Sequence, residues 1–281
     1  MTGSWARALV LAVSLGETVA PCARAQSADQ PSGVVITGRD LGLVAAATLG
    51  TAALFRLDVP AARLFGDSAF HARHRGFTSA AKRTSLVTET VLMLTGGTVY
   101  GIARLRHDEG TADVALHTTE SVASAALFIQ VVRGVLGRAR PFVVDAASER
   151  PDSDPYHFEL LHGFTSYDYR SFPSMHAMAS VAVAAALSTE MRERGTPHRA
   201  VISPVLYVGA AMPALARLYL DEHWASDIAL GAFLGAFAGQ KVVTYSHEHP
   251  DNRIDRALLG RRMNVGFMSG ARGLSFFASP F

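Results

Sequence analysis

The residues of this sequence that could carry out chemistry are arginines and histidines near the ends of apolar segments. In "RGVLGRARP", Arg133 and Arg140 are seven residues apart, so a continuous helix would place them on one face. Arg217, in "ARLYLDEHWASD", is a third candidate of the same kind. Guanidinium groups bind phosphate oxygens through paired hydrogen bonds, so these arginines indicate an anion site. Taken singly, arginines at helix ends more often cap carbonyls or face water.

A histidine and an aspartate follow Arg217 at a spacing that suits nucleophilic catalysis. His223 and Asp227 are four residues apart, so in the first turn of a helix the carboxylate can hold one imidazole nitrogen. The other nitrogen is then free to attack, and the carboxylate stabilises the positive charge that develops. Taken alone, such a pair is more often a surface ion pair.

The stretch "SFPSMHAMAS" places Ser174 and His176 where an apolar helix begins. Pro173 is favoured at helix starts, and serine is a good N-cap. A hydroxyl, unpaired backbone N–H groups and the helix dipole together favour an oxyanion at this position. His176 is a candidate acid for protonating a leaving oxygen. By itself the stretch also fits a capped helix with an incidental histidine.

Together, these three motifs predict a phosphoryl-transfer site that needs no metal and no organic cofactor. They resemble the pattern of the type 2 phosphatidic acid phosphatase family, which shares its core with bacterial nonspecific acid phosphatases and vanadium haloperoxidases. The family pattern is K-x6-RP, then PSGH, then SR-x5-H-x3-D, and residues 80–245 follow it in order and internal spacing. The resemblance implies a helical bundle, a phosphohistidine intermediate on His223 and leaving-group protonation by His176. It also implies phosphate contacts from Arg133, Arg140, Ser174 and Arg217.

Three positions depart from the family pattern. Arg133 replaces a lysine, which keeps the charge but changes its reach, and Ala216 replaces a serine, which removes one hydroxyl. Met175 replaces the glycine of PSGH and is the most serious departure, because glycine allows close approach of the backbone to a ligand or a positive φ. A methionine beside the phosphate would crowd it or change the choice of substrate.

Apolar segments must position these residues, and none of them shows the sustained alternation of a strand. We therefore expect an all-α, membrane-embedded bundle of about six helices, with a short C-terminal β-hairpin around the turn "SGARG". Gly231, Gly235 and Gly239 recur every four residues and form a flat face that lets another helix approach closely. The apolar segments are residues 41–55, 85–103, 113–137, 175–189, 200–220 and 224–243.

Length and charge decide which segments are suited to cross a membrane. A span needs roughly 20 apolar residues, and three segments have them: 85–103, 200–220 and 224–243. The segments 41–55 and 175–189 are short. The segment 113–137 contains polar and charged residues that are costly in lipid unless they face the bundle, namely Asp113, His117 and Glu120. His117 and Glu120 share a helix face and could pair there. A tightly packed soluble bundle is the alternative.

Composition and the N-terminus limit the class of protein. The chain has 281 residues, 49% of them hydrophobic and 18% charged, with a net charge of +2, which argues against nucleic acid as a partner. Residues 1–25 have the pattern of a secretory signal peptide, the alternative being an uncleaved first membrane helix. The only cysteine, Cys22, lies within this leader, so disulfides and thiol catalysis are excluded from the mature chain. The histidines do not cluster in the sequence as a metal site would.

These observations predict an order of domains. A signal peptide (1–25) precedes an N-terminal segment with one apolar helix and a basic connection (26–84). The phosphatase bundle (85–245) and a C-terminal tail (246–281) follow. We expect an exported protein whose site faces the periplasm, either in the inner membrane or soluble. The positive residues of 56–84 argue against this orientation in a membrane, because positive loops prefer the cytoplasm.

The leading functional hypothesis is a metal-independent phosphatase acting on a phosphomonoester or a diphosphate. Apolar helices around the site favour a lipid-linked substrate, such as phosphatidate or a polyprenyl diphosphate. A soluble periplasmic nonspecific acid phosphatase is the first alternative. A vanadium haloperoxidase-like enzyme and a non-catalytic membrane protein that binds phosphate are the others.

Overall fold

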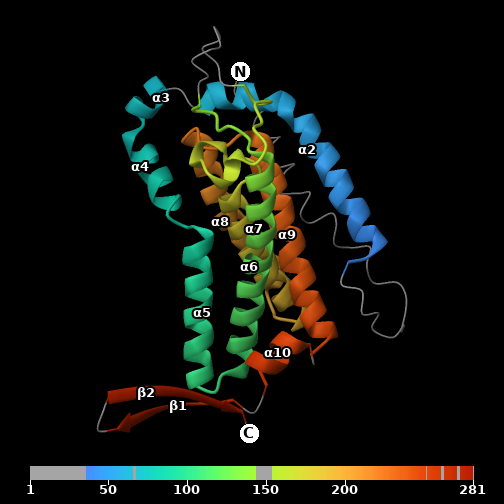
Figure 1. Cartoon of the computed structure of the whole chain (residues 1–281), viewed down its shortest axis with the longest axis vertical. Coiled ribbons are helices and arrows are strands. Elements are labelled where there is room, and N and C mark those ends of the chain that lie inside the picture. The colour runs from blue at the N-terminus through green and yellow to red at the C-terminus, as the bar shows by residue number, and fades with distance from the viewer. Residues whose placement is uncertain are drawn as a thin grey trace.

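Helix α7 (Met175–Glu193) lies at the centre of the helical bundle in the computed structural model of this protein (Figure 1). The structure describes residues 36–65, 68–143, 154–250, 252–260, 263–270 and 273–280. Most of α7 is buried, and its many alanines let its neighbours approach closely. It packs against α5 (Glu89–Leu105), α6 (Glu109–Leu136), α8 (Arg199–Tyr219) and α9 (Ala225–Glu248).

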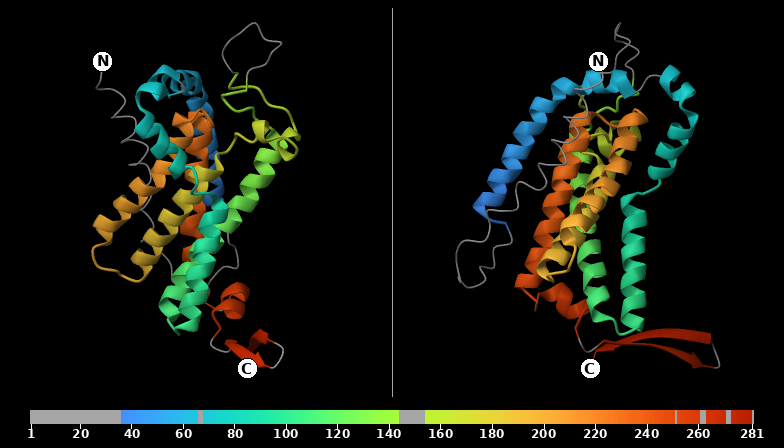
Figure 2. Two further views of the ribbon diagram at one scale, coloured as in Figure 1. Left: turned by 90° about the vertical axis from the view of Figure 1, so that its left-hand side faces the viewer. Right: turned by 180° about the vertical axis from the view of Figure 1, so that it is seen from behind.

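The remaining elements surround this core. Helix α2 (Gly38–Phe65) runs along the outside of the bundle against α9, as Figure 2 shows from two further sides. Short helices α3 (Ser68–Arg73) and α4 (Arg75–Thr84) follow it, and α4 contacts α8. The long connection after α6 contains the single turns η1 (His162–Phe164) and η2 (Tyr167–Tyr169), and α10 (Arg253–Leu258) follows α9. Strands β1 (Met263–Gly270) and β2 (Gly273–Pro280) pair antiparallel, which is the predicted C-terminal hairpin.

The predicted glycine face of α9 is where this helix meets α7. A Cβ atom added to Gly231 would overlap the carbonyl of Ser174, and one added to Gly235 would overlap that of Met178. At Gly239 the same atom would lie 2.6 Å from the carbonyl oxygen of Ala182. The small residues thus bring the two backbones together, and this contact places the beginning of α7 beside the beginning of α9.

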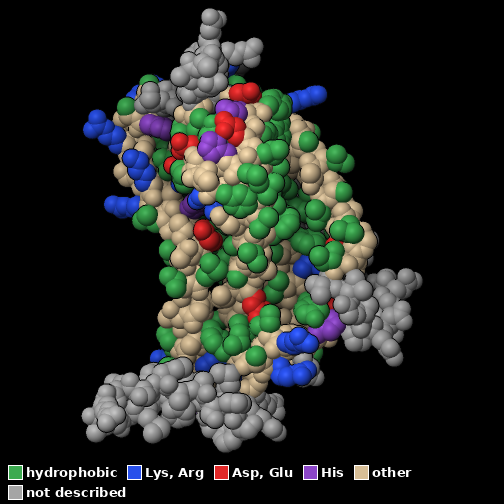
Figure 3. All heavy atoms as spheres, viewed as in Figure 1, with side chains coloured by type: hydrophobic (Ala, Val, Ile, Leu, Met, Phe, Trp, Pro, Cys, Tyr) green, Lys and Arg blue, Asp and Glu red, His purple; other side chains and the backbone are tan. Residues whose placement is uncertain are grey.

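Within the part of the chain that the structure describes, four helices are each long and apolar enough to cross a membrane: α2, α6, α8 and α9. Helices α4 and α5, which meet at a bend of 56°, together pass the same test. Large apolar side chains are exposed along them, and Leu49, Leu94 and Val205 are each at least 65% exposed. Figure 3 shows hydrophobic side chains spread over α2 and the helices beside it, with Lys and Arg gathered over α3 and α4 and near α10. The chain is a membrane protein.

The structure corrects several predicted boundaries. The first apolar helix was expected at 41–55 but extends to Phe65, because Asp58 faces the bundle and is paired there instead of ending the helix. Much of the expected basic connection that follows is therefore helical. Helix α2, whose segment was expected to be too short, qualifies, and so does α6, whose charges were expected to be costly in lipid unless they face the bundle. Helix α5, expected to span by itself, qualifies only together with α4. The predicted signal peptide lies outside the described residues.

Candidate active site

A cavity of about 200 Å³ opens where the ends of several helices converge. Its walls come from the α4–α5 bend, the end of α6, the connection after it, the beginning of α7 and the α8–α9 junction. Five of the seven predicted site residues line it, although they are spread over 91 positions of the chain (133 to 223). The lining residues are Thr88, Glu89, Arg133, Arg140, Tyr167, Arg170, Met175, His176, Arg217 and His223.

His223 lies two residues before the start of α9, next to the N-cap residue Trp224, and Asp227 lies in the first turn of that helix. The imidazole Nδ1 is 3.5 Å from Oδ2 of Asp227, so Nδ1 faces the carboxylate and the opposite nitrogen is left for the cavity. Burial, and then the positive charge of Arg140, lower the pKa of His223 to about 3 despite the carboxylate. The imidazole is therefore neutral, and able to act as a nucleophile, at any pH well above that value.

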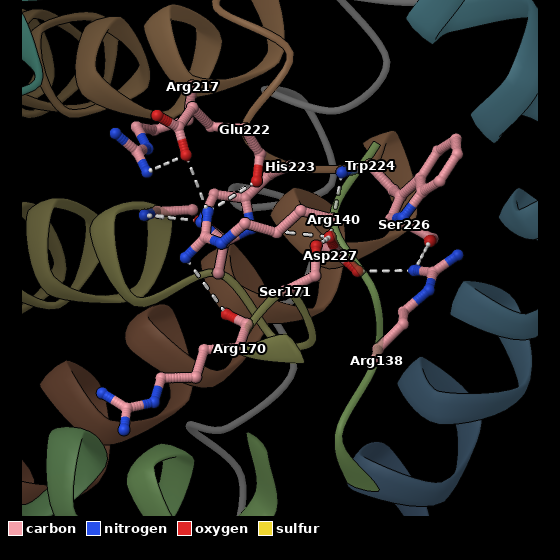
Figure 4. Close-up of polar contacts among 12 residues, drawn as sticks. Arg138, Arg140, Arg170, Ser171, Arg217, Glu222, His223, Trp224, Ser226 and Asp227 are labelled. Atoms are coloured by element: carbon pink, nitrogen blue, oxygen red, sulfur yellow. Dashed lines mark hydrogen bonds and ion pairs between the residues drawn. The ribbon is translucent and has the colours of Figure 1, made fainter. Parts of the chain in front are cut away.

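Asp227 is held in a fixed orientation by donors from three directions. Its Oδ2 accepts hydrogen bonds from the Ser171 hydroxyl and, at 2.9 Å, from the backbone N–H of Trp224. Its Oδ1 accepts one from the Arg138 guanidinium. Figure 4 shows Asp227 and Ser171 between Arg138 on one side and the group of Arg140, Glu222 and His223 on the other.

Arg138 is fully buried and was not among the predicted residues. Its guanidinium donates to Asp58 of α2 at 2.7 Å, to Ser226 of α9 at 2.8 Å and to the Pro155 carbonyl at 2.9 Å, as well as to Asp227. The guanidinium carbon lies 4.1 Å above the ring of Phe55. The side chain therefore ties α2, α9 and the long connection together directly behind the histidine.

Two of the predicted phosphate-binding arginines, both of which line the cavity, share the carboxylate of Glu222. Arg140 Nη1 is 3.1 Å, and Arg217 Nη2 is 2.9 Å, from Oε2 of Glu222. The Tyr167 hydroxyl accepts from Arg217 and donates to the same oxygen at 3.0 Å. Burial lowers the pKa of Arg140 only to about 10, so its guanidinium keeps its charge at neutral pH. The two arginines therefore already bind an oxyanion, and this oxyanion is the carboxylate of Glu222.

Arg133 is placed differently from the expected arrangement. The helix ends at Leu136, because Gly137 adopts φ +57° and a Cβ atom there would overlap the carbonyl of Glu159. Arg133 and Arg140 are consequently not on one helix face, and the prediction of a shared face was wrong. Both side chains still line the cavity, Arg133 from the last turn of α6, where Gln130 accepts its hydrogen bonds.

Ser174 caps α7 as predicted but does not line the cavity. It is fully buried, its hydroxyl accepts from the N–H of Ala177 at 3.4 Å, and its own N–H donates to the Asp227 carbonyl at 3.0 Å. Ser174 therefore links the beginnings of α7 and α9. Its predicted phosphate contact stays a prediction.

His176 and Met175 face the cavity from the first turn of α7. The Nε2 atom of His176 lies 3.1 Å from the Ser85 carbonyl, which suits a proton on that nitrogen. Met175 is 4% exposed and is not among the residues with positive φ, so the chain has no need of glycine's conformational freedom there. Its side chain instead fills space between the cavity and the core.

Several residues around the site were not predicted from the motifs. Arg138 and Glu222 stand within two residues of Arg140 and His223, and this closeness was the one available signal. The side chains of Tyr167, Arg170 and Ser171 come from the long connection after α6, and the only sequence signal for them is its length, since loops this long are often functional. Asp58 is 80 residues from Arg138, and no local pattern indicates their pairing.

The comparison with protein families agrees with the motifs. Residues 115–250 match the model of the PAP2 superfamily. A similar solved structure is the crystal structure of the first transmembrane PAP2 type phosphatidylglycerolphosphate phosphatase from Bacillus subtilis. It is 16% identical, with 72% of this chain and 98% of that chain covered and a TM-score of 0.37. A search of curated proteins found no match.

The match of residues 115–250 to the PAP2 superfamily model confirms the resemblance predicted from the motifs, and it supports a phosphatase. The matched segment includes α7, α8, α9 and most of α6, and so contains every predicted site residue.

Replacing Glu222 by glutamine should strengthen the binding of inorganic phosphate and orthovanadate by roughly tenfold. The neutral amide no longer supplies a charged competitor for Arg140 and Arg217. Isothermal titration of the detergent-solubilised protein measures both affinities. Glu193→Gln, which removes a carboxylate paired with Arg192 at the far end of α7, is the matched control. Unchanged or weaker anion binding in Glu222→Gln would contradict the competition between this carboxylate and the substrate.

Proposed function

We propose that this protein is a metal-independent phosphatase that removes phosphate from a lipid-linked phosphomonoester or diphosphate through a phosphohistidine on His223. The observation that carries the proposal is the arrangement around one cavity. A buried, neutral His223 lies with a fixed carboxylate on its Nδ1 side and guanidinium groups on its open side. This set supplies a nucleophile, an orienting group and positive charge for the transition state.

In the first step, the arginines hold the phosphate oxygens and His223 attacks. Its Nε2 forms a bond to phosphorus as the bond from phosphorus to the ester oxygen breaks. Asp227 stabilises the imidazolium that results, and its hydrogen bonds from Ser171 and Trp224 keep it aligned. His176, as an imidazolium, donates its Nε2 proton to the leaving oxygen and gives up the Ser85 carbonyl as its partner. Burial, and then the positive charge of Arg217, lower the pKa of His176 to about 4, so the negative charge of the bound phosphate has to hold this proton near neutral pH.

In the second step, water replaces the histidine on phosphorus. His176, now without that proton, accepts one from the attacking water, and the N–P bond breaks to release inorganic phosphate. The cycle restores a neutral His223 and a protonated His176. Because arginines supply the positive charge at the phosphate throughout, no step of this mechanism calls for a metal ion.

The surroundings of the cavity support a lipid substrate. Thr88 and Glu89, which line it, begin helix α5 at the bend after α4. On either side of them, Leu86 is 70% and Val91 45% exposed, so an acyl or prenyl chain could lie along this surface while its phosphate enters the cavity. The pattern of residues 1–25 supports an exported chain.

Purified protein should release phosphate from phosphatidate or undecaprenyl diphosphate in mixed micelles with chelator present. Orthovanadate should inhibit this release, because it mimics the phosphoryl group in transfer. His223→Gln should lower the rate by about a thousandfold or more, since it removes the nucleophile. The chelator-resistant rate on each lipid and on p-nitrophenyl phosphate is the measurement. A preference for p-nitrophenyl phosphate would contradict the lipid assignment, and full activity of His223→Gln would contradict the mechanism.

His176→Gln separates the acid from the nucleophile. A lipid alcohol is a poor leaving group that needs a proton, whereas p-nitrophenolate leaves without one. We therefore expect kcat to fall about 10²–10⁴-fold for phosphatidate and far less for p-nitrophenyl phosphate. Single-turnover rates for the two substrates test this. Equal losses on both would assign His176 to phosphate binding instead of proton donation.

A further inference from the structure

A second cluster of chemically active side chains lies in the bundle far from the phosphate cavity. It comprises His117 of α6, Glu190 of α7 and His247 of α9. Asp227, in the first turn of α9, is 20 residues before His247, which corresponds to about 30 Å of helix. The cluster therefore lies toward the end of the bundle where α10 packs, and the proposed phosphatase mechanism does not use it.

The three side chains converge closely enough to share one ion. Nδ1 of His117 is 2.6 Å from Oε1 of Glu190, and Nε2 of His247 is 3.0 Å from its Oε2. One ligand atom from each residue lies within 4.8 Å of the others. Because they come from three different helices, a cation held by all three would cross-link α6, α7 and α9.

The same place contains buried polar atoms that lack hydrogen-bond partners among the described residues. They are Nε2 of His117, Oε1 of Glu120 and Oδ1 of Asp255. The His117 side chain is only 6% exposed, and its Nε2 lies 3.5 Å from Oδ2 of Asp255. A histidine that binds a metal through one nitrogen characteristically directs the other at a carboxylate, and Asp255 stands in that position.

Charge at the cluster also favours a cation. The cluster contains three carboxylates, those of Glu120, Glu190 and Asp255. Arg194 is the guanidinium that pairs with the group, at 2.8 Å from Glu190. Arg194 is also 3.5 Å from Asp113 and its side chain is 32% exposed, so it can pair there while Glu190 turns to an ion. The expected pairing of His117 with Glu120 is not observed, since His117 bonds to Glu190 instead.

We propose that His117, Glu190 and His247 bind a divalent transition-metal ion of the zinc class, with the Asp255 carboxylate facing the other imidazole nitrogen of His117 and orienting its ring. Two imidazoles and one carboxylate form a donor set that suits Zn²⁺ and leaves a coordination position for water. The ion holds three helices of the bundle together at the end remote from the cavity. It takes no part in phosphoryl transfer.

The test is the metal content and thermal stability of the full chain, purified in detergent without a polyhistidine tag. After treatment with chelator, dialysis against Zn²⁺ and removal of excess ion, mass spectrometry should find one zinc per chain. The melting temperature should rise with Zn²⁺ and not with Mg²⁺. His247→Gln, whose side chain is 30% exposed and so tolerates change, should bind zinc at least tenfold more weakly, and His117→Gln likewise.

His249→Gln is the matched control, because His249 lies two residues further on and stacks on Tyr245 outside the cluster. It should retain the zinc and the rise in melting temperature. The proposal is overturned by a parent protein without stoichiometric zinc, or by equal zinc in the His117, His247 and His249 variants. These readouts do not depend on phosphatase activity.

Discussion

The buried guanidinium of Arg138 is the interaction on which the active-site end of this bundle depends. It pairs with both Asp58 and Asp227, which come from helices far apart in the sequence, and it also donates to the backbone of the long connection. Removing one partner from a fully buried ion pair typically costs about 3–5 kcal/mol, because the remaining charge has neither water nor a counter-ion. The position of α2 and the beginning of α9 are therefore set by the same side chain.

From this pairing the reactive geometry follows. Asp227 is fixed by Arg138, Ser171 and the N–H of Trp224, so it can face His223 in only one orientation. The glycine face of α9 against α7 then brings His176 to the cavity that His223 lines. Arg140 and Arg217 in the cavity wall pair with Glu222, so a substrate phosphate that binds these guanidinium groups competes with that carboxylate. Binding thus exchanges one anion for another between the same guanidinium groups.

The sequence predicted the parts of this site that depend on local spacing and residue chemistry. His223 and Asp227 meet because four residues make about one helical turn, and Ser174 caps α7 because serine precedes an apolar helical run. Contacts between segments that are distant in the sequence could not be predicted from local spacing. The pairing of Asp58 with Arg138 leaves no periodic signal, and Gly137 turned an expected continuous helix into a break before Arg140. The helical class and the tail hairpin followed from periodicity, whereas the full length of α2 depended on a buried charge being paired.

The most direct test of the account is to trap the phosphoenzyme. Protein mixed with ³²P-labelled phosphatidate and quenched in alkali within one turnover should carry the label on the peptide that contains His223. The label should be lost in acid, as expected of a phosphohistidine, and His223→Gln should carry none. Turnover with no label on the protein, or label on a residue other than His223, would contradict the proposed mechanism.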